Sequence, residues 1–180
     1  MSKTQPQHHS AFAPVHSRLP RMTTKPRPKG LDKPATAKII KGMSTAHTWL
    51  YTKSGGRLGR KWRVGSALRH GVPICLLTTT GRKSGEPRTV PLLHLPDGDR
   101  VILVASQGGL PTNPQWYGNL VADPKVQIQV GKNKRAMIAR TANATERTAL
   151  WPMLTQAYSD FDNYQSWTER EIPVVICEPA

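Results

Sequence analysis

The sequence has few of the residues that perform chemistry without a bound cofactor. It contains only two cysteines, Cys75 and Cys177, and both stand inside apolar runs. Such positions predict buried, reduced thiols rather than a disulfide or a catalytic nucleophile. The histidines lack the cysteine or carboxylate spacing of a metal site, so we expect no metal. The sequence has no catalytic triad, Walker loop or GxGxxG motif, so an enzyme built from this chain requires a cofactor.

Long apolar runs are also missing. No stretch of about 18 apolar residues occurs, so no membrane-spanning helix is expected. The polar, proline-rich start lacks the apolar segment of a secretion signal, and we expect a cytoplasmic protein. Residues 1–40 are basic and contain few apolar side chains, which predicts a disordered tail before a single domain over residues 41–180.

Acidic residues are scarce in the first half of the chain. Residues 1–90 carry 18 Lys and Arg against two acids, a net charge of +16, whereas residues 91–180 carry 8 against 9, a net charge of −1. This asymmetry indicates an anionic partner, which is an anionic ligand, a membrane surface or a nucleic acid. The charge alone does not select among the three.

Apolar runs and turn signals predict the secondary structure. Asp97-Gly98 between two apolar runs is a strong hairpin signal. The expected strands are residues 72–80, 88–95, 100–106, 126–130, 134–142 and 172–177, and the expected helices are residues 37–50, 114–120, 145–158 and 164–169. Thr145 is the expected N-cap of the helix over 145–158, and its expected apolar face is Ala149, Leu150, Met153, Leu154 and Ala157. This order predicts a mainly β (α+β) fold, a small antiparallel barrel with helices packed outside.

The first candidate site is the turn from Gly81 to Arg88, which we call the cationic turn. Arg82, Lys83 and Arg88 project near the same place, because Ser84-Gly85 and Pro87 turn the backbone. Their charged N–H groups, with backbone N–H groups of the turn, offer the donors that a phosphate needs. The alternative is an ordinary solvated hairpin with a few basic residues.

The second candidate site combines a loop and a short helix. The loop Ala105-Ser106-Gln107-Gly108-Gly109 is rich in small residues, which allow a ligand to approach the backbone. Asn113 is an expected helix cap and Pro114 fits the first helical position. Trp116 and Asn119, three residues apart, then share one face of the helix. The alternatives are a flexible loop and plain core packing of Trp116. Together, the two candidate sites favour a phosphorylated cofactor with a planar ring.

A third cluster is the aromatic series Tyr158, Phe161, Tyr164 and Trp167. Its spacing is typical of a helix face that packs on a core. Tyr158 and Tyr164 also have hydroxyls that donate hydrogen bonds or protons over a pocket.

In their order along the chain, these motifs resemble the deazaflavin (F420)-dependent nitroreductases, a split β-barrel family of actinobacteria. The resemblance runs from about Trp49 to Pro179 and does not cover the tail. The motifs that carry it are Leu77-Thr78-Thr79-Thr80-Gly81-Arg82-Lys83-Ser84-Gly85, Pro87-Arg88, Pro91-Leu92, Val104-Ala105-Ser106, Gly108-Gly109, Asn113-Pro114-x-Trp116-Tyr117-x-Asn119-Leu120, Tyr164-Gln165-Ser166-Trp167-Thr168 and Ile172-Pro173-Val174-Val175.

The resemblance implies roles for individual residues. Arg82, Lys83, Ser84 and Arg88 are expected to hold the acidic phospholactate and polyglutamate tail of coenzyme F420. The residues expected at the deazaflavin ring are Pro91, Ala105, Ser106, Trp116 and Asn119, and Gln107 is expected to bind the cofactor at the tail site. Those expected at the reacting centre are Ser106, Tyr158 and Tyr164. Three positions depart from the family pattern, because Leu93 and Phe161 replace tyrosines and Gln107 replaces a basic residue.

The expected function is hydride transfer from reduced F420 to a quinone, a nitroaromatic or an activated enone. Two alternatives are an FMN-binding split-barrel reductase and a non-catalytic F420 carrier with a basic, membrane-binding arm. We also expect a homodimer and peripheral binding to an anionic membrane, at the inner face of the cell membrane. We expect no nucleic-acid partner.

Overall fold

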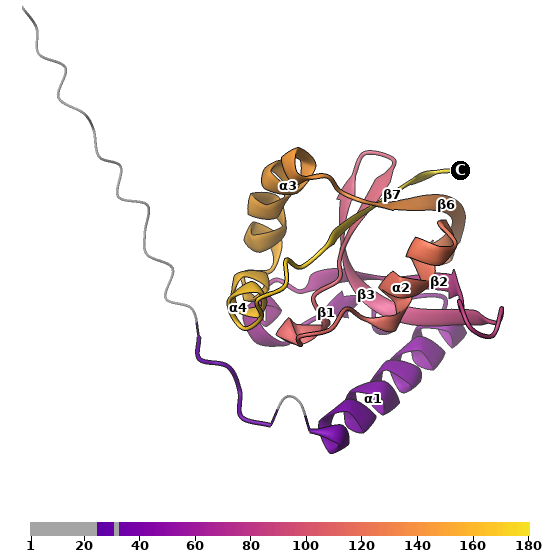
Figure 1. The fold of residues 1–180 in the computed structure, drawn as a ribbon. Helices are drawn as coiled ribbons and strands as arrows, with labels where there is room; N and C mark the ends of the chain where they lie inside the picture. Colours follow the sequence, from indigo (N-terminus) through magenta and orange to yellow (C-terminus); the bar gives the residue numbers. More distant parts are fainter. Residues whose placement is uncertain (1–24, 31–32) are drawn as a thin grey trace, which may run out of the picture.

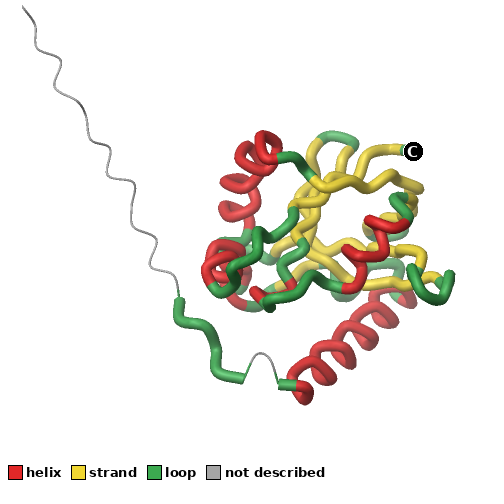
Figure 2. The backbone as a smooth tube through the Cα atoms, in the orientation of Figure 1, coloured by secondary structure: helices red, strands yellow, loops and turns green. Residues whose placement is uncertain are grey.

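Six of the seven strands close into an antiparallel barrel, and helices lie outside it (Figure 1). The structure is a computed structural model, and it describes residues 25–30 and 33–180. The strands are β1 Lys61–Trp62, β2 Val72–Thr80, β3 Pro87–Asp97, β4 Arg100–Val104, β5 Lys125–Val130, β6 Asn133–Thr141 and β7 Val174–Pro179. The helices are α1 Pro34–Lys53, α2 Gln115–Ala122, α3 Ala144–Ala157 and α4 Asp160–Ser166, with short 3-10 turns η1 Gly65–Ala67 and η2 Gln107–Gly109. Figure 2 shows the strands grouped together and the helices around them.

Strand β2 closes the barrel because it has partners on both edges. The sheet order is β1-β2-β3-β4-β7-β6-β5, and β2 also pairs with β5. Leu76 in β2 lies opposite Pro91 in β3 and opposite Gln129 in β5. The predicted barrel fold is confirmed, and β2 has the predicted bounds.

The inside of the barrel is filled by alternate side chains of the strands. Helix α2 adds Trp116 and Leu120 to this core. The strand residues are Cys75, Leu77, Val101, Leu103, Val126, Ile128, Met137, Ala139, Val175 and Cys177. Both cysteines are free and buried, as expected, and burial raises the pKa of Cys177 to about 12. They are therefore protonated core residues rather than nucleophiles.

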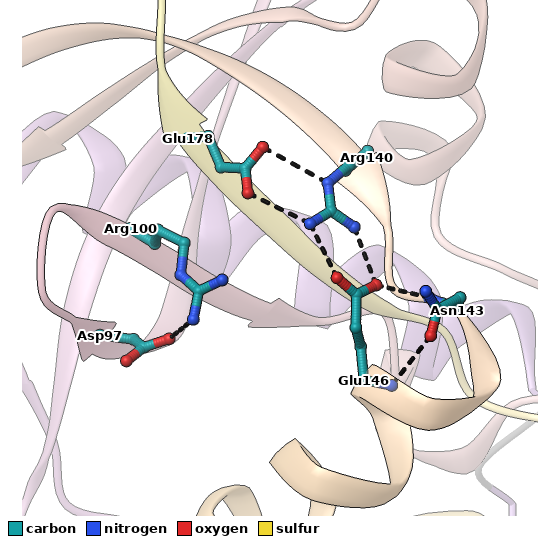
Figure 3. A network of polar contacts seen from close by, with 6 residues as sticks. All are labelled: Asp97, Arg100, Arg140, Asn143, Glu146 and Glu178. Carbon is teal, nitrogen blue, oxygen red and sulfur yellow. Dashed lines mark hydrogen bonds and ion pairs between the residues drawn. The ribbon is translucent and has the colours of Figure 1, made fainter.

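Helices α3 and α4 cover part of the outer face of the barrel. A second apolar cluster packs beneath them, built from Ala67, Val72, Ile102, Val104, Leu150, Leu154, Tyr158, Phe161, Ile172, Val174 and Ile176. Arg140 in β6 holds the start of α3 through both carboxylate oxygens of Glu146, at 2.8 Å each, and it also bonds Glu178 in β7 (Figure 3). This network fixes α3 to two strands.

The start of α3 corrects a prediction. The residue that caps the helix is Asn143 rather than Thr145, and its side chain accepts a hydrogen bond from the Glu146 N–H at 2.9 Å. Glu146 in return accepts from the Asn143 N–H, so the pair forms a capping box. Pro152 lies inside α3 without ending it. The predicted apolar face is also incomplete, because Leu150 and Leu154 are buried whereas Met153 is exposed.

Two other boundaries differ from the predictions. Pro114 is the N-cap of α2 rather than its first helical residue, and the side chain of Asn113 does not cap the helix. The turn between β5 and β6 contains only Gly131 and Lys132, because Asn133 already pairs with Val130.

The first described residues lie inside the predicted tail. Residues 1–24 and 31–32 of that tail are outside the described part of the chain. Helix α1 begins at Pro34, and its Tyr51 side chain anchors it to the barrel. The Tyr51 hydroxyl donates to the Ile74 carbonyl at 3.2 Å and accepts from the Gly131 N–H at 2.8 Å. Across residues 25–30 and 33–180, no helix has the length and apolarity to cross a membrane.

Candidate active site

The cationic turn connects β2 to β3 and is held by its own backbone. The Gly81 N–H donates to the Glu86 carbonyl at 2.8 Å, and the Gly85 N–H donates to the Gly81 carbonyl at 2.7 Å. Gly85 has a φ of 71°, a left-handed conformation that glycine adopts without strain. Lys83, Ser84 and Arg88 are exposed on this turn, and the Arg88 guanidinium donates to the Ser84 hydroxyl at 3.2 Å. The turn therefore presents charge on a fixed backbone.

Arg82 bends back from the turn onto helix α2. Its guanidinium donates to the Gln115 carbonyl at 3.2 Å, to the Gln115 side chain at 2.8 Å and to Asn119 Oδ1 at 3.1 Å. Helix position 118 permits this contact because it is glycine, where a Cβ atom would lie 3.0 Å from Arg82 Nη1. Arg82 thus couples the cationic turn to α2, a link that sequence spacing did not reveal.

Asn119 and Trp116 are buried on the same face of α2, as predicted. Asn119 donates from its side-chain amide to the Thr79 hydroxyl in β2 at 3.1 Å. Trp116 is 7% exposed and packs in the barrel core, so most of its ring faces protein. Of these two side chains, Asn119 is the one that contacts the cationic turn.

The loop after β4 adopts a left-handed turn at residues 107–109. The φ angles of Gln107, Gly108 and Gly109 are 48°, 64° and 77°. Gln107 is strained in this region, whereas the two glycines are not. Gly109 fits closely on α4, because a Cβ atom there would lie 2.8 Å from the Tyr164 carbonyl oxygen. The N–H groups of Gln107 and Gly108 have no acceptor within the described ranges and are available to a ligand.

Arg170 fixes this loop, although no sequence motif pointed to it. Its guanidinium donates to the carbonyls of Ser106 at 2.8 Å, Leu110 at 3.0 Å and Ala105 at 3.2 Å. It also donates to Asn113 Oδ1 at 2.7 Å, which is why the Asn113 side chain does not cap α2. One cation therefore holds both ends of the segment between β4 and α2.

The remaining predicted cofactor residues lie around this loop and in β3. Ala105 is fully buried, and both its N–H and its carbonyl are bonded within the protein. Ser106 is half-buried and Gln107 is exposed. Pro91 is half-buried in β3 and pairs with Leu76 of β2. The pairing of β3 with β4 begins only at His94, so the other edge of β3 has no strand partner at Pro91 among the described residues. A proline is tolerated there because its free edge requires no N–H donor.

The predicted tyrosines form a hydrogen-bonded pair. The hydroxyl oxygens of Tyr158 and Tyr164 are 3.1 Å apart, and Tyr158 is 3% exposed while Tyr164 is half-buried. Burial raises the pKa of Tyr158, and its hydrogen bond to Tyr164 raises it further. Burial also raises the pKa of Tyr164, whereas the same hydrogen bond lowers it. Either hydroxyl can be the donor in this pair, and when Tyr158 donates, the Tyr164 hydroxyl keeps its own proton for another acceptor.

Residues that departed from the family pattern have apolar surroundings. Phe161 is 5% exposed, and its ring contacts those of Tyr158 and Tyr164 at centroid distances of 5.1 and 6.3 Å. Leu93 packs against the outer apolar cluster. Neither side chain offers a hydrogen bond near the tyrosine pair.

Lys25, which belongs to the predicted tail, contacts α4 beside these aromatic side chains. The Lys25 N–H donates to Asn163 Oδ1 at 2.8 Å, and Trp167 Nε1 donates to the Lys25 carbonyl at 2.7 Å. The Lys25 ammonium is 3.5 Å from Asp160 Oδ1. The N-terminal segment thus borders the tyrosine pair, which composition alone did not predict.

These groups have the chemistry that an acidic cofactor with a ring requires. Exposed cations stand on the turn, and free N–H groups stand on the loop after β4. The donors of Arg82 and Arg170 are largely committed to the protein, so Lys83, Arg88 and the loop N–H groups remain for a ligand. Gly108 leaves the backbone accessible, because a Cβ atom there would meet nothing within 4 Å.

Comparison with known proteins agrees with this chemistry. A Mycobacterium tuberculosis protein provisionally named an F420H(2)-dependent quinone reductase is 48% identical over 117 residues, which span 65% of this chain and 98% of that protein. A solved F420-H2 dependent reductase (FDR-A) superposes with a TM-score of 0.56 and 42% identity, covering 59% of this chain and 94% of its own. A structure described as a domain-swapped dimer has a TM-score of 0.57 and 33% identity, covering 79% and 99% of the two chains.

The sequence pattern of one family extends over nearly the whole domain. The F420H(2)-dependent quinone reductase family matches residues 43–179, which include the cationic turn, the loop after β4, α2 and the tyrosine pair. The dependence on F420 that the motifs predicted is therefore confirmed, and so is the expectation of an enzyme. The chain belongs to the F420H(2)-dependent quinone reductase family, and it is an oxidoreductase that uses coenzyme F420.

Proposed function

We propose that the protein reduces a quinone at a site formed by the cationic turn, the loop after β4 and Tyr164. Nitroaromatics and activated enones are further acceptors of the same electron-poor class. When bound in its reduced form, F420 supplies a hydride from C5 of its deazaflavin ring. The observation that carries the proposal is the coupling of Arg82 to Asn119, which holds the cationic turn against α2.

Lys83, Ser84 and Arg88 are the residues we assign to the acidic tail of the cofactor. Their donors are exposed on a turn whose backbone is already closed, so little ordering is required when an anion binds. Arg82 adds its charge nearby and keeps the turn in place. We assign the N–H groups of Gln107 and Gly108 to the ring, with Pro91 and Asn119 beside it and Trp116 and Ala105 supporting them from the core.

Tyr164 is the residue we assign to the acceptor substrate. When its hydroxyl accepts from Tyr158, it retains a proton to donate to a carbonyl or nitro oxygen as negative charge develops there. Tyr158 is a positioning residue, since it is almost completely buried. Ser106 provides a hydroxyl at the edge of the same loop.

We also propose that the protein binds an anionic membrane surface on its cytoplasmic side. The exposed apolar side chains in residues 43–68 are Met43, Trp49, Leu50, Leu58, Val64 and Leu68. Exposed cations accompany them at Lys53, Arg57, Arg60, Lys61, Arg63 and Arg69. The His47 ring contacts the Gly59 carbonyl at 2.7 Å, which folds residues near 58 back on α1. Mixed apolar and basic surfaces of this kind bind anionic lipids, where quinones also reside.

Vesicle sedimentation tests the membrane proposal. The wild type should sediment with vesicles that contain phosphatidylglycerol, and less so as salt increases. Combined Trp49→Ser and Leu58→Ser substitutions should release the protein, whereas Val121→Ser, at an exposed position on α2, should not. No binding of the wild type would refute the proposal.

A homodimer is a further part of the proposed function. It is supported by the 33% identical structure described as a domain-swapped dimer. Light scattering coupled to size exclusion should report a mass of about twice 19.9 kDa. A monomeric mass at micromolar concentration would contradict it.

Turnover is the test of the proposed reaction. Reduced F420 is mixed with the protein and a soluble quinone, and the return of the oxidised cofactor absorbance is followed. We expect multiple turnovers with F420 and none with reduced FMN. Binding of F420 without acceptor reduction would favour a non-catalytic carrier, and turnover with FMN alone would favour the FMN-dependent alternative.

A further inference from the structure

The far end of the barrel contains a cavity that is separate from the candidate active site. Its volume is about 280 Å³, and it is lined by His94, Pro96, Gly98, Arg100, Val101, Val130, Asn133 and Arg135. The cationic turn includes the first residues of β3, whereas Gly98 follows the other end of this strand. At about 3.3 Å per residue, the cationic turn is about 30 Å from Gly98 along the strand, and Pro91 of the predicted ring site is three residues from His94.

Strand alternation explains why these side chains meet. In β6, Arg135 is two residues from Met137 and four from Ala139, so it lies on the same face of the strand as these two core residues. In β5, Val130 has the parity of Val126 and Ile128, which also face the core. The inward positions are thus apolar along the middle of the barrel and become polar at its mouth. Barrel mouths with an apolar floor and a few polar groups commonly bind small molecules.

Arg135 supplies an unneutralised positive charge to this cavity. It reaches from β6 to the β3–β4 turn, where its guanidinium donates to the Asp99 carbonyl at 3.3 Å. No carboxylate pairs with it in the part of the chain that the structure describes. Arg100, by contrast, is paired with Asp97. Arg135 is therefore the cation that remains for a ligand carboxylate.

His94 supplies an unused hydrogen-bond acceptor. The residue is 7% exposed, and its Nδ1 atom has no partner among the described residues. Burial lowers the pKa of His94 and so favours the neutral ring, and when its other ring nitrogen donates to the Pro73 backbone carbonyl, Nδ1 is the bare acceptor. A buried polar atom without a partner costs free energy, and a ligand hydroxyl would satisfy it.

We propose that this barrel-mouth cavity binds a small carboxylate that also carries a hydroxyl group. Arg135 binds the carboxylate, Val101 and Val130 contact the apolar body, and His94 Nδ1 accepts from the hydroxyl. The cavity has the volume for a single aromatic ring with two polar substituents. The bound acid is a ligand independent of the cofactor, because its site shares no residue with the cationic turn or the loop after β4.

Calorimetric titration of the full chain with para-hydroxybenzoate tests this site. The wild type should bind the probe, and benzoate and para-hydroxybenzamide should each bind more weakly. Arg135→Gln should weaken the probe by at least about tenfold, because a charged hydrogen bond is lost. The matched control is Lys134→Gln, an exposed cation on the outward face of the same strand, which should leave affinity within about twofold.

Two further measurements separate this site from nonspecific binding and from the cofactor site. His94→Phe should make para-hydroxybenzoate and benzoate bind equally, and His94→Leu serves the same purpose if circular dichroism shows that the phenylalanine variant misfolds. Saturating F420 should leave the affinity for the probe unchanged. The proposal is overturned if the wild type does not bind millimolar probe, if Arg135→Gln and Lys134→Gln bind it equally, or if F420 displaces it.

Discussion

The Asn119 side-chain oxygen accepts hydrogen bonds from both the backbone N–H and the guanidinium of Arg82, at 3.2 and 3.1 Å. One buried amide therefore joins the cationic turn to α2, the helix whose Trp116 and Leu120 side chains enter the barrel core. Its amide nitrogen continues the chain of bonds to the Thr79 hydroxyl in β2. The turn that we assign to the cofactor tail is thus hydrogen-bonded to the barrel wall through Asn119.

Replacing Asn119 by alanine should loosen this connection. Loss of its hydrogen bonds should lower the free energy of unfolding by about 1–3 kcal/mol and weaken F420 binding by about tenfold. Urea denaturation and a fluorescence titration with F420 measure the two effects. Gln156→Ala, at an exposed position in α3, is the control and should change neither. A wild-type affinity in the Asn119 variant would show that the turn is positioned by other contacts.

Replacing Tyr164 by phenylalanine should remove the proton donor at the acceptor. We expect kcat for quinone reduction to fall by about 10- to 100-fold with little change in F420 affinity. Tyr117→Phe is the matched control, because the Tyr117 hydroxyl bonds Thr141 outside the tyrosine pair. An undiminished kcat in the Tyr164 variant would remove this residue from the reaction.

The tyrosine pair also predicts how the rate of quinone reduction depends on pH. The pKa values of Tyr158 and Tyr164 both lie above the ordinary value of 10, chiefly because burial disfavours the phenolate. Each hydroxyl therefore stays protonated below that value, and the rate should not decline from tyrosine ionisation between about pH 6 and about pH 9. A fall in wild-type kcat near pH 8 that is absent from Tyr164→Phe would contradict this.

Arg170→Lys should release the loop after β4. A lysine cannot reproduce the fork that holds the carbonyls of Ala105, Ser106 and Leu110, so we expect a loss of about 2 kcal/mol in stability. Faster hydrogen exchange across residues 105–110 should accompany it. Arg63→Lys, at an exposed position, controls for the substitution type. Unchanged exchange in this loop would refute the assigned role of Arg170.

The capping box of α3 predicts a response to acid. The pKa of Glu146 is lowered from 4.5 to about 2, first by Arg140 and then by the Asn143 N–H. A lowered pKa contributes stability that is present above pH 4.5 and is lost as the pH falls through about 2. Glu146→Gln should flatten this part of the stability profile, whereas Glu169→Gln should leave it intact. Parallel profiles for wild type and Glu146→Gln would contradict the assignment.

Sequence reasoning succeeded where the signal was local. Strand β2 is an apolar, β-branched run between Gly71 and Gly81, and both of its ends were predicted correctly. The α3 cap was wrong even though the signal was present, since Asn143 stands three residues before Glu146, the spacing of a capping box. The capping-box spacing was the stronger local signal, and Thr145 was chosen as the cap in its place.

Sequence reasoning failed where a side chain bonds to a distant segment. Asn113 was expected to cap α2, but Arg170, 57 positions away, binds its oxygen instead. Arg82 was expected to project near Lys83 and Arg88, and nothing in its spacing indicated that Asn119 and Gln115 bind it. No periodicity encodes such pairings, because they depend on how the barrel closes. The assignment of individual residues to the cofactor stays a prediction, although the family itself was identified from ordered motifs.

The most direct test of the central claim is whether the cationic turn selects the longer acidic tail of F420. Fluorescence titrations of wild type, Lys83→Ala and the control Lys134→Ala should be compared for F420 and for FMN. We expect Lys83→Ala to weaken F420 binding by about five- to tenfold and to affect FMN, which has one phosphate, much less. Superimposable F420 curves for wild type and Lys83→Ala would contradict the claim.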